Sequence, residues 1–474
     1  MSTLKRASRN SVWLLASNIV VKLIGTYTAV AVARYLGDVG LGQYSFAVAF
    51  VSFFAIFANF GFDALLTRDI AKNKDETQRY VGNISSIKIL LSLITMLILF
   101  IVSFLIDKPM VIRILLWVFG LDIIINALKG TISSALQGHE IIKYTAISQI
   151  FEKAIWALVL IFIIRMDLGI TSIAFGTMIT TIIGSIYLFL IYKKRLGKIV
   201  LLSDKKFWKK LFIQAWPFTL TGIFLLIYWK IDLVMLSFYQ TDAVVGWYSA
   251  AYRLLELLMI APVVLMTPLY PVFSRLAKFD KAKLKDTFKL AVRYLLILMI
   301  PIVFGVMLLG DKIILYIYGK QFVNSVIALK ILIFATLFAF INYPFLMLLN
   351  SMGEQKRGTF QTGISAVLNI LLNLILIPMF SYIGASITTV IAEASFLTLS
   401  YIYIVKNGFR INFLSVIFKP LIAAAIMGIF IYFFSGLNLI LLVICAAIIY
   451  VISILALREI DKHDFEMLRN IMRK

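Results

Sequence analysis

Runs of about 20 consecutive apolar residues recur along the whole chain, and they constrain its fold more than any other feature. A run of that length spans the hydrocarbon core of a bilayer as one helix. Hydrophobic residues make up 62% of the 474 residues and charged residues 15%, against about half and a quarter in soluble domains. The sequence therefore predicts an all-α polytopic membrane protein. We expect about fourteen transmembrane helices, near residues 11–33, 44–66, 84–106, 111–136, 145–164, 170–192, 211–238, 244–272, 290–309, 323–350, 359–378, 384–405, 416–434 and 438–457.

Lysine and arginine concentrate in alternate loops of this predicted topology. Of 46 such residues, 32 lie on the side that holds the N-terminus, six lie on the opposite side, and eight lie within helices or at their ends. Cytoplasmic loops carry an excess of basic residues, so we expect a multi-pass protein of the cell (cytoplasmic) membrane with both termini in the cytoplasm. The net charge of +23 then needs no nucleic-acid partner.

Residues that bind metals through nitrogen or sulfur are scarce. The chain has one cysteine, Cys445, and two histidines, His139 and His463. A disulfide framework and a zinc site of the usual Cys/His type are therefore excluded. We expect no metal site.

Two ten-residue segments, 38–47 and 242–251, share the pattern D-x-x-x-G-x-Y-S-x-A at an offset of 204 residues. The offset equates the first predicted helix with the seventh, so the halves are parallel repeats of six helices related by an axis along the membrane normal. We expect two pseudo-symmetric six-helix lobes and two C-terminal helices. The predicted divisions are an N-terminal lobe (1–195), a basic cytoplasmic linker (196–210), a C-terminal lobe (211–405), a helix pair (416–457) and a cytoplasmic tail (458–474).

Residues 37–47, and residues 61–71 with Gly61-Phe62-Asp63 and Thr67-Arg68-Asp69, carry a family resemblance. The sequence resembles the polysaccharide-exporter (oligosaccharide flippase) branch of the multidrug/oligosaccharidyl-lipid/polysaccharide flippase superfamily. The resemblance covers the whole chain and implies transfer of a lipid-linked sugar from the cytoplasmic to the outer leaflet. It also implies a cycle that uses neither ATP nor a soluble cofactor, and the sequence has no P-loop.

Charged residues at membrane depth are the first candidates for the site, because a charge at the centre of a membrane helix costs about 2.5–3.5 kcal/mol. Lys22 lies in the middle of the first predicted helix, and Asn18 and Thr26 lie one turn away on the same face. We predict that Lys22 and Asn18 face a substrate cavity. The alternative is that Lys22 pairs with an acid such as Asp63 for packing alone.

The predicted eighth helix carries Arg253 and Glu256, and the seventh carries Lys230 and Asp232. Arg253 and Glu256 are three residues apart and could neutralise each other. Lys230 and Asp232 are two apart and cannot share one face. Arg253 and Lys230 are candidate substrate contacts.

The predicted fourth helix carries a polar stripe of Asp122, Asn126, Lys129 and Ser133. Such stripes often hold helices together, and Lys129 could also reach the cytoplasmic interface. Lys129 is nevertheless a candidate substrate contact. Together the candidate amines predict a cavity that suits a pyrophosphate.

Glu393, near the middle of the predicted twelfth helix, has no basic residue in its own helix. We predict that it takes part in coupling to H⁺ or Na⁺, with Asp63 and Asp232 as further candidates. The alternative is a protonated acid that is hydrogen-bonded to Asn369 or Asn373.

The predicted function is a flippase for a polyprenyl-(pyro)phosphate-linked oligosaccharide, with membrane lipids and glycan-assembly enzymes as partners. One alternative is a cation-coupled multidrug exporter of the same superfamily. Another, from a different class, is a membrane-embedded sugar-polymerising enzyme. The enzyme is disfavoured because the longest predicted outer loop, 310–322, has no paired carboxylates.

Overall fold

The computed structural model describes residues 3–459, with the side chains of Ser17 and residues 19–459. All regular secondary structure in this range is helical, which confirms the predicted all-α class. Most of the predicted tail (458–474), and the side chain of Asn18, lie outside the described part.

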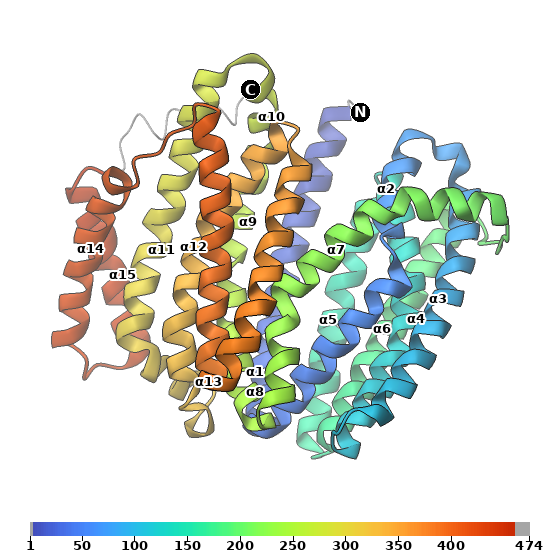
Figure 1. The fold of residues 1–474 in the computed structure, drawn as a ribbon, viewed down its shortest axis with the longest axis horizontal. Coiled ribbons are helices and arrows are strands. Elements are labelled where there is room, and N and C mark those ends of the chain that lie inside the picture. Colours follow the sequence, from blue (N-terminus) through green and yellow to red (C-terminus); the bar gives the residue numbers. More distant parts are fainter. Residues whose placement is uncertain (1–2, 460–474) are drawn as a thin grey trace. The chain divides into compact units, whose positions relative to one another are not determined.

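Twelve helices in the described range are long and apolar enough to cross a membrane. Two of them contain a non-helical residue, Gly37 (φ 67°) in α1 (Thr3–Asn59) and Ser381 (φ 56°) in α13 (Gln355–Lys406). A straight helix of 57 residues would extend about 85 Å, far beyond a hydrocarbon core of about 30 Å. Both helices turn back at their breaks (Figure 1). The breaks divide the twelve helices into fourteen segments, which agrees with the sequence prediction.

The chain divides into two compact units, residues 1–249 and 250–474. Unit 1 contains α1, α2 (Phe62–Lys72), η1 (Lys74–Glu76), α3 (Thr77–Leu105), α4 (Met110–Gly138), α5 (Ile142–Arg165), α6 (Gly169–Leu196), α7 (Lys205–Tyr239) and the start of α8 (Asp242–Leu258). Unit 2 contains the rest of α8, α9 (Ile260–Met266), η2 (Thr267–Leu269), α10 (Tyr270–Phe279), α11 (Lys281–Ile317), η3 (Lys320–Phe322), α12 (Ser325–Ser351), α13, α14 (Phe413–Phe433) and α15 (Leu439–Ala456). The helix α7 thus belongs to the same compact unit as α1–α6, and the two-lobe division at 196–210 stays a prediction.

The segment before α7 is fastened to α3. Asn83 accepts hydrogen bonds from the backbone N–H of Asp204 and from the indole N–H of Trp208, both at 2.9 Å. Asp204 in turn caps α7 by accepting from the N–H groups of Lys206 and Phe207, each at 3.1 Å. The backbone N–H of Phe207, followed by Arg79, holds the pKa of Asp204 below its usual value. These bonds fix the entry of α7 into unit 1.

The two copies of the repeated pattern contact each other reciprocally: a residue of one copy meets the same partner position in the other copy as its own equivalent does. A Cβ on Gly42 would lie 1.8 Å from the carbonyl oxygen of Asp242, and one on Gly246 would lie 1.9 Å from that of Asp38. Only glycine permits this approach of the two backbones. The side-chain bonds are reciprocal too: Gln43 donates to Asp242 at 3.0 Å and Trp247 to Asp38 at 2.8 Å, while the hydroxyls of Ser45 and Ser249 are 2.6 Å apart. We call this contact the repeat junction.

Candidate functional site: a polar cavity in unit 1

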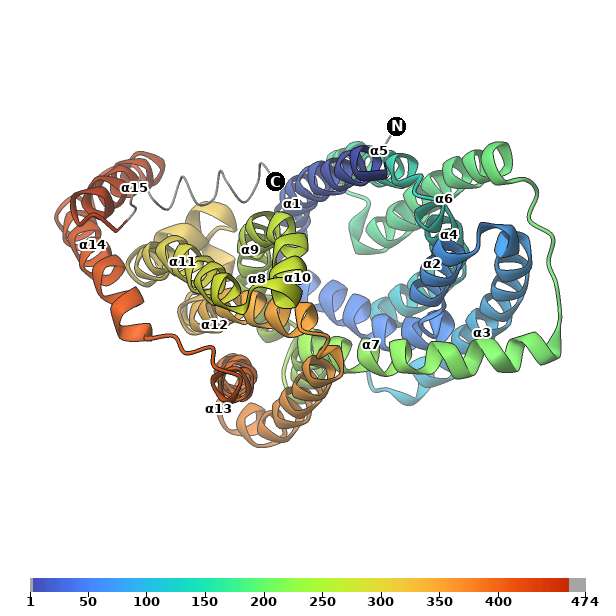
Figure 2. The ribbon, with the colours of Figure 1, turned by 90° about the horizontal axis from the view of Figure 1, so that it is seen from above.

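A cavity of about 810 Å³ lies inside unit 1, lined by residues of α1, α2, α4, α5, α6 and α7. Seen from above, these helices surround a common centre (Figure 2). Three carboxylates, Asp63, Asp122 and Glu152, and two amines, Lys153 and Lys230, line it together with amide and hydroxyl side chains. The cavity is therefore of mixed charge, whereas the sequence predicted that amines would dominate.

Asp63 is positioned by a break in the chain. Phe60 and Gly61 adopt positive φ angles of 45° and 67°, so the α1 helix stops and α2 begins with Asp63 in its first turn. The ammonium group of Lys88 in α3 donates to Asp63 at 2.6 Å and to the carbonyl oxygen of Ala127 at 3.2 Å. The Lys88 side chain is 0% exposed, and that of Asp63 is 30% exposed. The partner of Asp63 is therefore Lys88, and the alternative that Lys22 pairs with it is wrong.

A second ion pair joins Lys129 in α4 to Glu152 in α5. Gly184 in α6 makes room for it, since a Cβ there would lie 2.5 Å from the Glu152 carboxylate. Glu152 lines the cavity, whereas the candidate Lys129 does not; Lys129 neutralises the Glu152 carboxylate from behind the lining.

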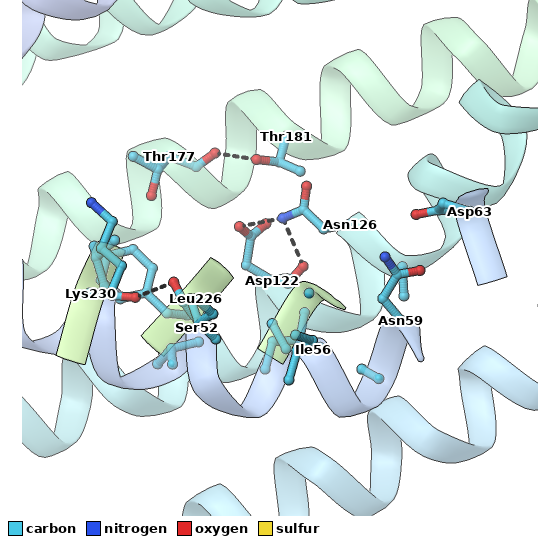
Figure 3. Close-up of a pocket in the computed structure, with 18 of the residues that line it drawn as sticks. Ser52, Ile56, Asn59, Asp63, Asp122, Asn126, Thr177, Thr181, Leu226 and Lys230 are labelled. Atoms are coloured by element: carbon cyan, nitrogen blue, oxygen red, sulfur yellow. Dashed lines mark hydrogen bonds between the residues drawn. The ribbon is translucent and has the colours of Figure 1, made fainter. Parts of the chain in front are cut away.

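Asp122 is the third carboxylate of the cavity. Its Oδ2 accepts a hydrogen bond from Asn126 at 2.8 Å, one turn along α4, and Thr177 and Thr181 of α6 lie opposite (Figure 3). Its Oδ1 is buried and has no hydrogen-bond partner. No lysine or arginine of the described range forms a salt bridge with it. The predicted stripe on α4 thus reaches the cavity at Asp122 and Asn126.

The remaining candidates of unit 1 are dispersed. Lys230 lines the cavity, and its role as a substrate contact stays a prediction. Asp232 does not line it; its side chain is buried and accepts a 2.9 Å hydrogen bond from the hydroxyl of Tyr248. Lys22 is exposed and does not line this cavity.

The candidates of unit 2 are Arg253 and Glu393. Arg253 and its neighbour Glu256 are both half-buried on α8. Glu393 is buried, and Asn342 of α12 donates to its carboxylate at 2.7 Å. Sequence reasoning did not indicate that partner. Asn369 and Asn373, which it did propose, share a hydrogen bond of 2.9 Å with each other.

Sequence reasoning missed Lys88, Glu152 and Lys153. Each is a charged residue within a predicted apolar helix, so the criterion that selected Lys22 would have found them. The pairing of Lys88 with Asp63 joins residues 25 positions apart. No spacing within a single helix could have indicated it.

Unit 2 holds a second cavity, of about 860 Å³, with a different lining. Aliphatic residues of α9, α11, α14 and α15 form nearly all of its wall. The hydroxyl of Tyr450, one of its few polar groups, donates to the carbonyl oxygen of Ile297 at 2.7 Å. The surface that remains suits a hydrocarbon.

A family model described as "Polysaccharide biosynthesis protein" matches residues 7–277, which is more than half of the chain. A second model, MatE, matches residues 217–375. The chain belongs to the polysaccharide biosynthesis protein family, in the polysaccharide-flippase branch of the multidrug/oligosaccharidyl-lipid/polysaccharide superfamily.

Known proteins similar to this chain include both transporters and proteins without a described activity. An uncharacterized membrane protein of Methanocaldococcus jannaschii is 24% identical over 98% of both chains. The probable flippase AglR of Haloferax volcanii is 30% identical over 34% of this chain and 35% of its own. A solved structure of the lipid II flippase MurJ, in an inward closed conformation, superposes with a TM-score of 0.81 at 17% identity and covers 94% of this chain and 99% of its own. That likeness establishes the fold of a multi-pass membrane protein.

Proposed function

We propose that this protein moves a polyprenyl-(pyro)phosphate-linked oligosaccharide from the cytoplasmic to the outer leaflet by alternating access. Its family and the printed names of its relatives, a probable low-salt glycan biosynthesis flippase and a lipid II flippase, support this class of cargo. The fold shared with the solved flippase supports a transporter rather than an enzyme.

The observation that carries the proposal is the contrast between the two cavities. The cavity of unit 1 is lined by carboxylates, amines, amides and hydroxyls, and the cavity of unit 2 is almost wholly apolar. Polar groups in an apolar medium are costly unless they are hydrogen-bonded, so a cargo with a hydrated head and a hydrocarbon tail needs both environments. A lipid-linked glycan has both parts.

The proposal extends to orientation, energy source and partners. The protein lies in the cytoplasmic membrane with both termini inside, H⁺ or Na⁺ drives the cycle, and enzymes that assemble glycans supply the substrate. The exposed amine of Lys22 and the guanidinium of Arg253 are proposed to meet the pyrophosphate, which concentrates negative charge.

The test is removal of the gene, followed by mass spectrometry of the lipid fraction. We expect lipid-linked glycans to accumulate and wild-type protein to clear them. Lys22→Ala should insert at normal levels yet fail to clear them, while Lys22→Arg retains part of the activity because it keeps the charge. An unchanged lipid profile after removal would reject the flippase.

A second candidate is a cation-coupled exporter of organic ions, favoured by the MatE match over residues 217–375 and by a multidrug MATE transporter structure with a TM-score of 0.66 at 14% identity. Everted vesicles distinguish the two. Gradient-driven uptake of a fluorescent organic cation, with no change in lipid-linked glycans, would favour the exporter.

A further inference from the structure

The three carboxylates that line the polar cavity of unit 1 differ in how they are neutralised. Asp63 is paired with Lys88 and Glu152 with Lys129. Asp122 forms no salt bridge in the described range: Asn126 donates to its Oδ2 at 2.8 Å, and Thr181 and, at longer range, the charge of Lys129 also act on the carboxylate, while its Oδ1 has no donor. Asp122 is therefore the carboxylate of this wall with an oxygen atom, Oδ1, that has no hydrogen-bond donor.

The buried side-chain atoms of the cavity lining that lack a hydrogen-bond partner are all acceptors. Two buried side-chain oxygens of lining residues have no donor, Oδ1 of Asp122 on α4 and Oδ1 of Asn59 on α1. Both are acceptors, and both belong to sp² groups whose last torsion is broad, so a modest rotation presents them to a ligand. Since an unsatisfied buried polar atom costs about 1–3 kcal/mol, a ligand that brings hydrogen-bond donors is favoured here.

Phosphate does not fit that requirement. An ionised phosphate offers acceptor oxygens and negative charge, and Asp122 would repel it. Sugar hydroxyls and acetamido N–H groups do donate, and a carboxylate can accept from two neighbouring hydroxyls at once. Lys153 and Lys230 on the same lining can donate to the ring and hydroxyl oxygens of the sugar.

The shape and the other lining residues suit a sugar ring. A volume of about 810 Å³ falls in the range of about 300–1,000 Å³ that small-molecule sites occupy. Tyr44, Phe119 and Trp229 also line the cavity, and their flat rings can cover the apolar C–H face of a sugar. Thr181 of α6 lies within hydrogen-bonding reach of Asp122, and Thr177 lies one turn before it on the same helix (Figure 3).

We propose that the polar cavity of unit 1 binds the sugar part of the cargo and not its phosphate, with Asp122 as the residue that accepts from sugar hydroxyls and sets the preference for a neutral sugar. The inference rests on the proposed function, because it names the part of the lipid-linked glycan that this cavity binds. Asn126 orients the Asp122 carboxylate.

Two short-chain probes test the inference on the full chain in lipid nanodiscs: citronellyl pyrophosphate alone and the same lipid carrying one N-acetylglucosamine. We expect wild-type protein to bind the sugar-bearing probe more tightly. Asp122→Ala should remove this advantage, by about 10- to 150-fold, the ratio that a hydrogen bond to a charged group supports. Its affinity for the sugar-free probe should stay unchanged. Asp75→Ala, which removes an exposed acid of η1, is the matched control and should bind both probes like the wild type.

Asp122→Asn keeps the shape of the side chain and serves if Asp122→Ala does not fold. It should lose part of the sugar preference because a neutral amide accepts more weakly. Thr181→Val, a variant with nearly the same volume on the opposite wall, should also lower the preference.

Equal binding of the two probes by the wild type overturns the inference and leaves the flippase standing. An equal loss for both probes in Asp122→Asn also overturns it, since Asp122 would then act on the whole site. So does a variant that keeps its sugar preference but loses its response to an imposed H⁺ or Na⁺ gradient, which would make Asp122 a coupling group. If neither probe binds the wild type and gene removal leaves the lipid-linked glycans unchanged, the proposed function itself fails.

Discussion

Lys88 and Asp63 form an ion pair whose two ends differ in their access to water, and this asymmetry gives a strong prediction. Lys88 is 0% exposed, whereas Asp63 is 30% exposed and lines the polar cavity. Removing the Asp63 carboxylate leaves the ammonium group of Lys88 buried without a counter-charge and without access to water. Removing the Lys88 amine leaves the Asp63 carboxylate without a counter-charge, but water in the cavity can hydrate it. Asp63→Asn should therefore destabilise the protein more than Lys88→Met.

The magnitudes follow from the burial of each side chain. Breaking a buried ion pair by removing one partner costs about 3–5 kcal/mol. For Asp63→Asn the loss of stability has an upper limit, because the buried lysine can give up its proton. Deprotonating an ordinary lysine at pH 7 costs about 4.6 kcal/mol, which is 3.4 pH units at 1.36 kcal/mol each. For Lys88→Met the exposed fraction of Asp63 lowers the cost to about 1–2 kcal/mol. The double variant Asp63→Leu/Lys88→Met should lie close to the wild type, since an apolar pair often replaces a buried ion pair without loss.

The assay is unfolding of the purified protein in detergent, followed by tryptophan fluorescence, for the wild type, the two single variants and the double variant. Lys330→Met is the control, because its partner Asp311 lies 2.8 Å away but is 60% exposed. A pair of that kind contributes at most about 1 kcal/mol. If Lys88→Met destabilises as much as Asp63→Asn, or if the double variant is no better than Asp63→Asn, the reasoning from burial is refuted.

Three further predictions concern the repeat junction, the α7 cap and coupling. Gly42→Ala would place its Cβ 1.8 Å from the carbonyl oxygen of Asp242 and should reduce the monodisperse fraction in size-exclusion chromatography. Gly305→Ala, in α11 with nothing within 4 Å, should be neutral or stabilising by up to about 1 kcal/mol. The lowered pKa of Asp204 means that its stabilising effect is present above about pH 4 and is lost as the pH falls through the folded pKa. The melting temperatures of Asp204→Asn and the wild type should therefore differ at pH 7 and converge near pH 3. Glu393→Gln in liposomes should lose its response to an imposed H⁺ or Na⁺ gradient, and an unchanged response would leave Glu393 with a packing role.

The fold was accessible from the sequence because membrane helices are specified by local apolar length. The segments on either side of Gly37 in α1 and of Ser381 in α13 were each predicted as a separate helix. Polar residues near both positions interrupt the apolar runs. The offset of 204 residues predicted which motifs are equivalent. It did not predict that Gly42 and Gly246 would bring the equivalent backbones into contact, because parallel repeats need not meet at their matching residues.

The site was less accessible, because pairing between helices decides which charges remain available. Lys129 is a prominent amine in the sequence, yet Glu152 neutralises it. Asp122 belonged to a stripe interpreted as helix packing, yet it keeps an acceptor without a donor in the polar cavity. Spacing within α4 shows which residues share its face, but only the positions of α5 and α6 reveal what lies opposite.

The repeat junction sets an energetic condition on the proposed alternating access. Two of its hydrogen bonds end on the carboxylates of Asp38 and Asp242, and the third joins Ser45 to Ser249. At about 1.5–3 kcal/mol for a bond to a charged group and about 0.5–1.5 for a neutral one, separating the two copies would cost about 3.5–7.5 kcal/mol. Inverting a 99:1 population takes about 5.5 kcal/mol of differential binding. If the cycle opens this junction, the cargo or the coupling ion must bind the opened form more tightly by a similar amount. If the junction stays closed, the segments that carry Gly42 and Gly246 stay in contact through the cycle and this cost does not arise.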